Sequence, residues 1–195
     1  RWHGFVRMER AFARPGFAAH LAEGGATMLQ FGMESASPAM LETMRKGLAP
    51  DQARAVLRAT ADVGIRNHVY LLFGLPGERD EDREATLAFV EEEVLGRGDG
   101  QAGASIHDLN NAILNLARGS PMHRNPADYG ITEIHAFGPE TDLSLYDDFR
   151  CGDVHPRVEA RRWLDRRFFK SPAVRQVLGG LTNPFAANHA CFLPR

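Results

Sequence analysis

The first 116 residues alternate between two hydrophobic patterns, one typical of helices and one typical of strands. Apolar residues recur every three or four positions in some segments, and they form short continuous runs in others. The runs predict strands at residues 2–12, 27–33, 65–73 and 105–116, the first ending in a loop. The helical spacing predicts helices at residues 15–23, 38–46, 50–63 and 80–94, with a turn at 74–77 and a loop at 96–103.

Signals at the ends of these segments support the predicted helices. Ser37 can accept a backbone hydrogen bond at a helix N-terminus, and Pro38 suits the first helical position because its missing N–H needs no partner there. Gly47 and Gly64 can end the two helices that precede them. Strands and helices that alternate at this spacing predict a parallel α/β sheet, either part of a barrel or an open sheet.

The character of the chain changes after Gly119, which predicts a division into residues 1–119 and a C-terminal extension, residues 120–195. Residues 120–153 are rich in Pro, Gly, Asp and Asn, with little periodicity. Helical spacing returns at residues 155–169, and a short helix is predicted from Pro172 to Gly179-Gly180. The apolar tail, residues 181–195, is expected to pack back on the body.

Composition narrows the class of protein. The chain has 195 residues, 44% of them hydrophobic and 25% charged, as in globular domains. A net charge of −2 gives no attraction to nucleic acid, and no apolar run approaches the roughly 20 residues that span a bilayer. The two cysteines, Cys151 and Cys191, exclude a disulfide scaffold and a site of three or four thiolates from this chain. We expect a reduced, cytoplasmic protein.

Polar residues follow two predicted strands, at the ends where parallel α/β proteins bind ligands. Glu34, Ser35 and Ser37 follow the first, and their carboxylate and hydroxyls can hydrogen-bond the vicinal hydroxyls of a ribose, although Glu34 and Ser37 can also simply cap a helix. Lys46 lies twelve residues after Glu34, within reach of an anionic group.

The second strand end carries Gly74-Leu75-Pro76-Gly77-Glu78, where glycines allow a close backbone approach to a flat ligand. It is not a phosphate loop, because no Gly-Lys-Ser/Thr follows. Taken alone, a turn of this composition is more often structural than functional.

These motifs in this order resemble the second half of a radical S-adenosylmethionine (radical SAM) enzyme. The resemblance covers residues 1–116 and rests on Phe31-Gly32-Met33-Glu34-Ser35-x-Ser37-Pro38, Leu41-x-x-Met44-x-Lys46-Gly47, Val63-Gly64-Ile65 and Gly74-Leu75-Pro76-Gly77-Glu78. A looser resemblance, at residues 115–135, is to members that also carry a cobalamin-binding domain.

The resemblance implies a partial (βα)₆, TIM-like barrel, of which residues 1–119 would form the third to sixth strands. Family members hold S-adenosylmethionine against a 4Fe-4S cluster and generate a 5′-deoxyadenosyl radical. Residues that match the family's binding positions are Glu34 and Ser35 for the ribose, Lys46 for the methionine carboxylate, and Gly74, Pro76 and Gly77 for the adenine. Tyr70 stands where some relatives have a carboxylate for the ribose.

The cluster motif of the family, Cys-x₃-Cys-x₂-Cys, is absent from this sequence. We therefore expect the cluster ligands to lie upstream of Arg1, which makes this chain a fragment that is inactive alone. Cys151-x₃-His155 supplies only two ligands and is taken as incidental, as are His68, His107 and His123. The resemblance implies an electron donor and a small-molecule or peptide substrate, with methyl transfer, rearrangement and oxidation all open.

Two other interpretations remain open. One is a non-redox α/β module that binds S-adenosylmethionine or another adenosine ligand without a cluster. The other is a fragment of a hydrolase or aldolase barrel, which ranks last because no nucleophile and base form a pair in the sequence.

Overall fold

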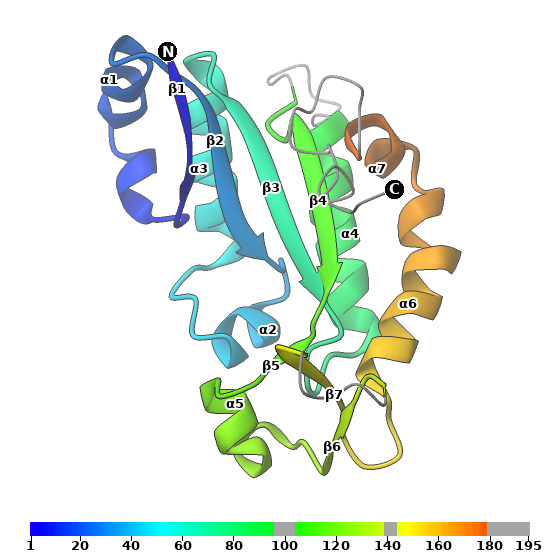
Figure 1. Ribbon diagram of the computed structural model, residues 1–195. Helices are drawn as coiled ribbons and strands as arrows, with labels where there is room; N and C mark the ends of the chain where they lie inside the picture. The colour runs from blue at the N-terminus through cyan, green and yellow to red at the C-terminus, as the bar shows by residue number, and fades with distance from the viewer. Residues whose placement is uncertain (96–103, 139–143, 179–195) are drawn as a thin grey trace, which may run out of the picture.

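The computed structural model describes residues 1–95, 104–138 and 144–178, and a parallel four-stranded sheet dominates it (Figure 1). The strands lie in the order β1-β2-β3-β4. Their bounds are β1 Trp2–Val6, β2 Ala26–Glu34, β3 Arg66–Phe73 and β4 Asp108–Ile113. Because each strand pairs in parallel with its successor, right-handed crossovers place the connecting helices on one face, as in a barrel. The predicted parallel α/β fold is confirmed.

The α-helices of the first part of the chain lie where the hydrophobic pattern predicts helices, whereas a short 3₁₀ helix begins at Arg10, where the pattern predicts the loop that ends the first strand. These helices are the 3₁₀ helix η1 Arg10–Ala13 and the α-helices α1 Phe17–Glu23, α2 Pro38–Thr43, α3 Pro50–Asp62 and α4 Asp80–Leu95. Helix α2 is shorter than predicted, since it ends at Thr43 and Arg45 then adopts a φ of 52°. Helices α3 and α4 lie behind the sheet in Figure 1.

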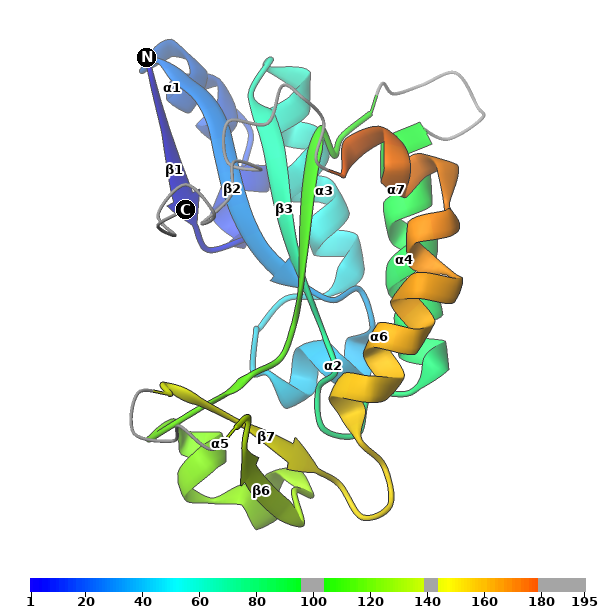
Figure 2. The same ribbon diagram turned by 45° about the vertical axis from the view of Figure 1, so that its right-hand side comes forward.

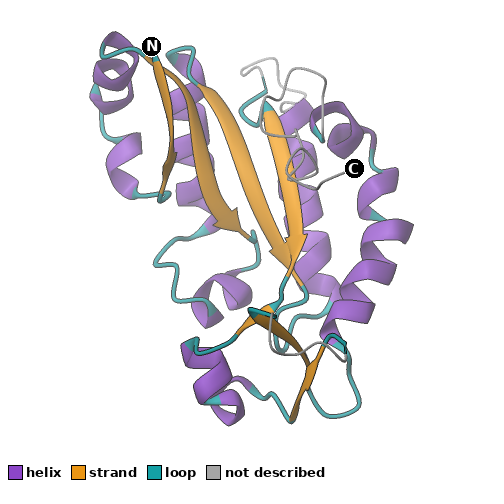
Figure 3. Ribbon diagram, viewed as in Figure 1, coloured by secondary structure: helices purple, strands orange, loops and turns teal. Residues whose placement is uncertain are grey.

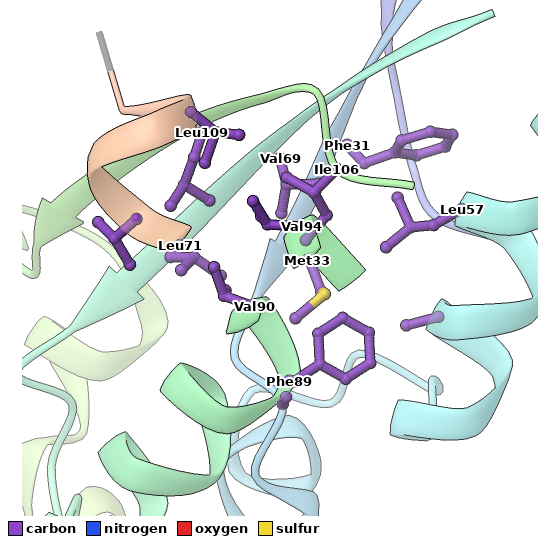
Figure 4. Close-up of a cluster of buried hydrophobic side chains, with 14 of the residues drawn as sticks. Phe31, Met33, Leu57, Val69, Leu71, Phe89, Val90, Val94, Ile106 and Leu109 are labelled. Atoms are coloured by element: carbon purple, nitrogen blue, oxygen red, sulfur yellow. The ribbon is translucent and has the colours of Figure 1, made fainter. Parts of the chain in front are cut away.

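Alternation along β2 and β3 divides the sheet into an apolar face and a more polar face. On the helix side, Phe31 and Met33 of β2 and Val69 and Leu71 of β3 are at most 1% exposed. They pack against apolar side chains of α3 and α4, as Figure 4 shows. The opposite face of the sheet carries Gln30 and His68, both at most 1% exposed, and the partly exposed Tyr70, so these polar side chains lie away from the helix packing.

The predicted strand at residues 105–116 is wrong as a single element. It consists of β4 and, after a break, β5 Leu116–Ala117, which belongs to a second sheet (Figure 3). This sheet is antiparallel, in the order β5-β7-β6, with β6 Glu133–Ala136 and β7 Tyr146–Arg150. The short helices α5 Pro121–Arg124 and η2 Pro126–Tyr129 lie before β6. The weak periodicity of residues 120–153 concealed these elements, because the strands are short and half exposed.

The last described elements are α6 Pro156–Arg166, η3 Phe168–Lys170 and α7 Pro172–Val177. They pack beside α4 and the far edge of the sheet, as Figure 2 shows. Trp163 and Phe168 are buried there, and Ser171 caps α7 by accepting the N–H of Val174. The helix predicted at residues 155–169 is thus confirmed, with its last turn in 3₁₀ form.

Some predictions lie outside the described residues, namely the loop at 96–103, the helix end at Gly179-Gly180 and the packing of residues 181–195. The division at residue 119 remains a prediction. In the part of the chain that is described, no helix has both the length and the apolar character needed to cross a bilayer.

Candidate functional site

The candidate site lies where β2 and β3 end, because the predicted binding residues follow these two strands. Glu34 is the last residue of β2 and has a φ of 70°, a left-handed conformation that residues other than glycine rarely adopt. The strand pairing is irregular between Gly32 and Glu34, next to β3. This local distortion turns the end of β2 away from regular strand geometry at the residue that carries the carboxylate.

Lys46 lies against the Glu34 carboxylate. Its Nζ donates to Oε1 of Glu34 at 3.0 Å and to the carbonyl oxygen of Gly32 at 3.1 Å. Arg7 supports the same loop by donating from Nη2 to the carbonyl oxygen of Lys46 at 3.0 Å. The structure therefore brings two predicted site residues together, with Lys46 holding Glu34.

Gly32 makes room for this pair. A Cβ at residue 32 would lie 2.8 Å from Oε1 of Glu34, closer than real Cβ contacts, and 3.8 Å from Nζ of Lys46. The carboxylate therefore occupies the space that any other side chain at residue 32 would need. Because Gly32 has no side chain, the carboxylate of Glu34 can lie over the backbone of β2 at this point.

Ser35 lies in a different environment from Glu34. It is 2% exposed, and its hydroxyl hydrogen-bonds Oγ1 of Thr86 on α4 at 3.0 Å and accepts the backbone N–H of Ser37 at 3.0 Å. Ser37 in turn donates to Oδ1 of Asp82 at 2.6 Å and caps α2. These buried contacts tie the loop after β2 to α4, and the ribose contact of Ser35 stays a prediction.

The turn after β3 is held by a buried ion pair. Glu78 accepts the backbone N–H of Gly74 through Oε2 at 2.7 Å, and the same oxygen accepts Nε of Arg83 at 3.0 Å. Both side chains are at most 3% exposed. Burial raises the pKa of Glu78, while the charge of Arg83 and the Gly74 hydrogen bond act to lower it.

Gly74 and Gly77 both have the positive φ that glycine tolerates, 74° and 75°. A Cβ at Gly74 would lie 3.0 Å from Cγ2 of Ile113 and 3.4 Å from Cβ of Ala160, so this glycine also permits close packing. No atom of the described residues lies within 4 Å of the position that a Cβ would take at Gly77. Glu78 thus holds the turn through its hydrogen bond to the Gly74 N–H, and the two glycines allow its backbone conformation.

Two cavities reach Glu34, and one of them also reaches Lys46. One, of about 370 Å³, extends from Glu34 and Lys46 to Leu75, Met122 and Tyr129 near the second sheet. The other, of about 450 Å³, lies over the polar face of the sheet and also reaches Glu34. A third hollow, of about 540 Å³, includes Pro76. Glu34 therefore lines two cavities, and its carboxylate can accept hydrogen bonds from ligand hydroxyls.

Sequence reasoning did not identify Gln30 as a site residue, although it lines the 450 Å³ cavity. Gln30 is 1% exposed, and its Oε1 accepts the hydroxyl of Tyr70 at 2.8 Å. Its Nε2 has no hydrogen-bond partner among the described residues. A glutamine inside the otherwise apolar run at residues 27–33 was the available signal.

The remaining candidates are placed elsewhere. His107 accepts the backbone N–H of Asn67 through Nδ1 at 3.1 Å, and His123 contacts Asp147 at 3.2 Å, so both have protein partners. His155 contacts Asp148 at 2.9 Å and not Cys151, a free thiol. His68 is buried beside Tyr70, with ring centroids 4.6 Å apart.

The described residues do not provide an iron–sulfur site. No group of three or more His, Cys, Asp or Glu side chains converges among them as metal ligands would. Cys151 is half-buried, and burial raises the pKa of its thiol, which disfavours the thiolate that a cluster needs. The described residues thus offer no ligand set for a cluster.

Comparisons with known proteins identify similar sequences and folds. Residues 7–90, which include Glu34, Lys46 and Gly74–Gly77, match the Radical SAM superfamily. Over 71 residues the chain is 35% identical to an uncharacterized methyltransferase, PH0819, of Pyrococcus horikoshii. The matched region covers 36% of this chain and 16% of that protein.

Solved structures share the fold at low sequence identity. The radical S-adenosylmethionine methyltransferase TsrM from Kitasatospora setae, bound to tryptophan and a SAM analogue, aligns with a TM-score of 0.63 at 16% identity, over 90% of this chain and 36% of TsrM. The cobalamin-dependent S-adenosylmethionine radical enzyme OxsB aligns with a TM-score of 0.63 at 15% identity, over 86% of this chain and 29% of OxsB. The chain thus spans about a third of each of these proteins.

Proposed function

We propose that this chain, whose residues 7–90 match the Radical SAM superfamily, is the C-terminal part of the catalytic domain of a radical SAM enzyme and binds S-adenosylmethionine at the ends of β2 and β3. One observation carries the proposal. Glu34, held by Lys46, lines two cavities at the strand ends where a parallel α/β sheet binds ligands, and one of these cavities also reaches Leu75 of the turn after β3.

Glu34 would accept hydrogen bonds from the two ribose hydroxyls, as an acidic residue does in dinucleotide-binding folds. Lys46 would keep that carboxylate in place, and its remaining ammonium hydrogen can also reach the carboxylate of the methionine. Gly74, Pro76 and Gly77 would offer backbone surface to the adenine. When bound next to a reduced 4Fe-4S cluster, S-adenosylmethionine supplies a carbon radical that abstracts hydrogen.

The cysteine ligands of that cluster would come from outside this chain, because neither cysteine of the sequence lies in a Cys-x₃-Cys-x₂-Cys motif. The coding sequence upstream of Arg1 tests this. A Cys-x₃-Cys-x₂-Cys motif is expected within about 100 residues, which allows for two βα units of roughly 30 residues plus loops. An intact gene without the motif would contradict the enzyme and favour a non-redox module that binds an adenosine ligand.

For the reaction, we favour cobalamin-dependent methyl transfer. The support is the looser resemblance of residues 115–135 to cobalamin-dependent members and the fold shared with TsrM and OxsB. An electron donor and a small-molecule or peptide substrate complete the proposal.

Calorimetric titration of the chain with S-adenosylmethionine tests the binding site. We expect Glu34→Ala to weaken binding about tenfold or more, since hydrogen bonds to a charged group contribute roughly 1.5–3 kcal/mol. The control is Glu81→Ala, on the exposed side of α4, where the carboxylate is 79% exposed. Equal affinity in the Glu34 variant and the original chain would overturn the ribose assignment.

A further inference from the structure

The polar face of the sheet holds a second group of side chains to which the proposed S-adenosylmethionine site assigns no contact, although Tyr70 among them stands where some relatives have a ribose-binding carboxylate. Gln30 on β2, Tyr70 on β3 and Phe5 on β1 lie side by side across three neighbouring strands, since Phe5 pairs with Gln30 in the sheet register. Together they line the 450 Å³ cavity. Gln30 lies four residues before Glu34, roughly 13 Å along the strand.

The Gln30 amide is buried and only half satisfied. Its oxygen accepts the Tyr70 hydroxyl, which leaves Nε2 without a hydrogen-bond acceptor among the described residues. Burying an amide N–H without a partner is unfavourable, and buried polar groups are nearly always paired. A donor that is buried, unpartnered and at the wall of a cavity fits a ligand that brings the acceptor.

Two aromatic rings stand beside this donor. The Phe5 and Tyr70 rings lie with centroids 5.9 Å apart and planes tilted by 36°. Phe5 lies on the edge strand β1 and is 73% exposed, so its ring is accessible to a ligand. Aromatic rings that are open on one side favour stacking with another flat ring.

We propose that Gln30, Tyr70 and Phe5 recognise the substrate, and that this substrate presents a planar aromatic or heteroaromatic ring with a hydrogen-bond acceptor on it. The ring would lie against Phe5 and Tyr70, and Nε2 of Gln30 would donate to the acceptor. A volume of 450 Å³ accommodates a two-ring group. This inference rests on the proposed function, because it names the substrate class of the same barrel-like interior.

Two flat two-ring probes test the hydrogen-bond direction on the chain. Quinoline has a ring nitrogen that accepts, whereas indole has an N–H that donates. We expect quinoline to bind in the millimolar range, to shift the NMR resonances of the Gln30 side-chain amide and to bind more tightly than indole. Absence of a shift, or tighter binding of indole, would overturn the proposal.

Two variants separate a loss of ligand binding from a general effect of the substitution on the fold. Gln30→Glu preserves the size and the acceptor for Tyr70 but replaces the donor, so the affinity for quinoline should fall about tenfold. The matched control is Asn110→Asp on β4, which makes the same chemical change at an exposed position outside the cavity. Equal losses in both variants would show a general charge effect and would contradict the role of Gln30.

S-adenosylmethionine separates this inference from the proposed function. If the chain binds both S-adenosylmethionine and quinoline without competition, both proposals are supported. Binding of S-adenosylmethionine alone would refute only the aromatic site, and binding of quinoline alone would refute the proposed function. Displacement of quinoline by S-adenosylmethionine would assign the rings to adenine and overturn a separate substrate site.

Discussion

Nζ of Lys46 lies 3.0 Å from Oε1 of Glu34, and this ion pair at the end of β2 is about three-quarters shielded from solvent. Lys46 also donates to the Gly32 carbonyl, so it links the loop after α2 to the strand on which Glu34 lies. Glu34 in its left-handed conformation thus has a fixed partner before any ligand binds. Preorganisation of this kind lowers the entropy lost when a ligand is bound.

We expect Lys46→Met to weaken S-adenosylmethionine binding about tenfold, because the carboxylate of Glu34 loses the cation that orients it. Calorimetry on Lys46→Met, Glu34→Gln and the double variant measures the coupling. If Lys46 acts through Glu34, the two losses are strongly non-additive, with a coupling of about 0.5–3 kcal/mol. Additive losses would mean that Lys46 contacts the ligand independently.

Substituting Gly32 should displace the carboxylate without unfolding the sheet. A Cβ at residue 32 would lie 2.8 Å from Oε1 of Glu34, which is the mobile end of a side chain and can move. Gly32→Ala is therefore expected to lower the affinity for S-adenosylmethionine about tenfold with a small change in Tm. Gly4→Ala on β1 is the control, since its nearest contact would be 3.9 Å away. A Gly32 variant with unchanged affinity would exclude a role for the observed Glu34 position.

We expect the side chain of Ser35 to stabilise the fold and not to bind the ligand. Its hydroxyl contacts Thr86 and the backbone of Ser37 in a buried loop. Ser35→Ala is expected to lower the free energy of unfolding by about 1–3 kcal/mol while changing S-adenosylmethionine affinity less than about twofold. Thr86→Val, which removes the partner hydroxyl, should destabilise similarly. Weaker binding at unchanged stability would instead support the ribose contact predicted from the sequence.

The parts of the fold that could be predicted are those set by residues close together in the sequence. Ser37 and Pro38 mark the start of α2 correctly, and the apolar run around Phe31 marks β2, because capping and periodicity are local properties. The break between β4 and β5 was missed because Leu116 and Ile113 continue one apolar run although they belong to different sheets. Only tertiary pairing separates them.

The site shows the same limit. Motifs identify Glu34 and Lys46, and the structure brings them into contact, but no local pattern predicts that Lys46 pairs with Glu34. Gln30 was overlooked because its significance depends on the neighbouring strands, which supply Tyr70 as a partner and Phe5 as a neighbour. A polar residue inside an apolar run is a local signal whose meaning is set by distant residues.

The buried Glu78–Arg83 pair should control the stability of the turn after β3. Arg83→Met leaves a buried carboxylate without its cation, which is expected to destabilise the protein by about 3–5 kcal/mol. Urea unfolding measures the loss. The double variant Glu78→Gln, Arg83→Met should regain part of the lost free energy of unfolding, because the buried charge without a partner is gone. If the double variant is no more stable than Arg83→Met, the loss comes from packing and not from charge.

The same variant has a pH signature. Burial raises the pKa of Glu78 and Arg83 opposes this, so Arg83→Met should raise the pKa further. Above the ordinary value of 4.5, the folded variant then retains a proton that the unfolded chain releases. The free energy of unfolding should therefore fall more steeply with rising pH in Arg83→Met than in the original chain. Parallel pH profiles would contradict the assignment.

His107 should make the fold sensitive to acid. Burial lowers its pKa below 6.5, and the charge of Arg66 acts in the same direction. Its Nδ1 accepts the backbone N–H of Asn67, which only the unprotonated nitrogen can do. Between the lowered folded pKa and 6.5 the unfolded chain binds a proton that the folded chain does not, so stability is lost as pH falls through this window.

The test of this acid sensitivity is His107→Asn, whose Oδ1 can accept the same N–H without titrating. Urea unfolding from about pH 7 to pH 5 should show a smaller loss of stability in the variant than in the original chain. The slope should not vanish, because burial lowers the pKa of His68 as well. An unchanged slope would mean that His107 is protonated equally in the folded and unfolded states, and that its hydrogen bond to Asn67 does not restrain its titration.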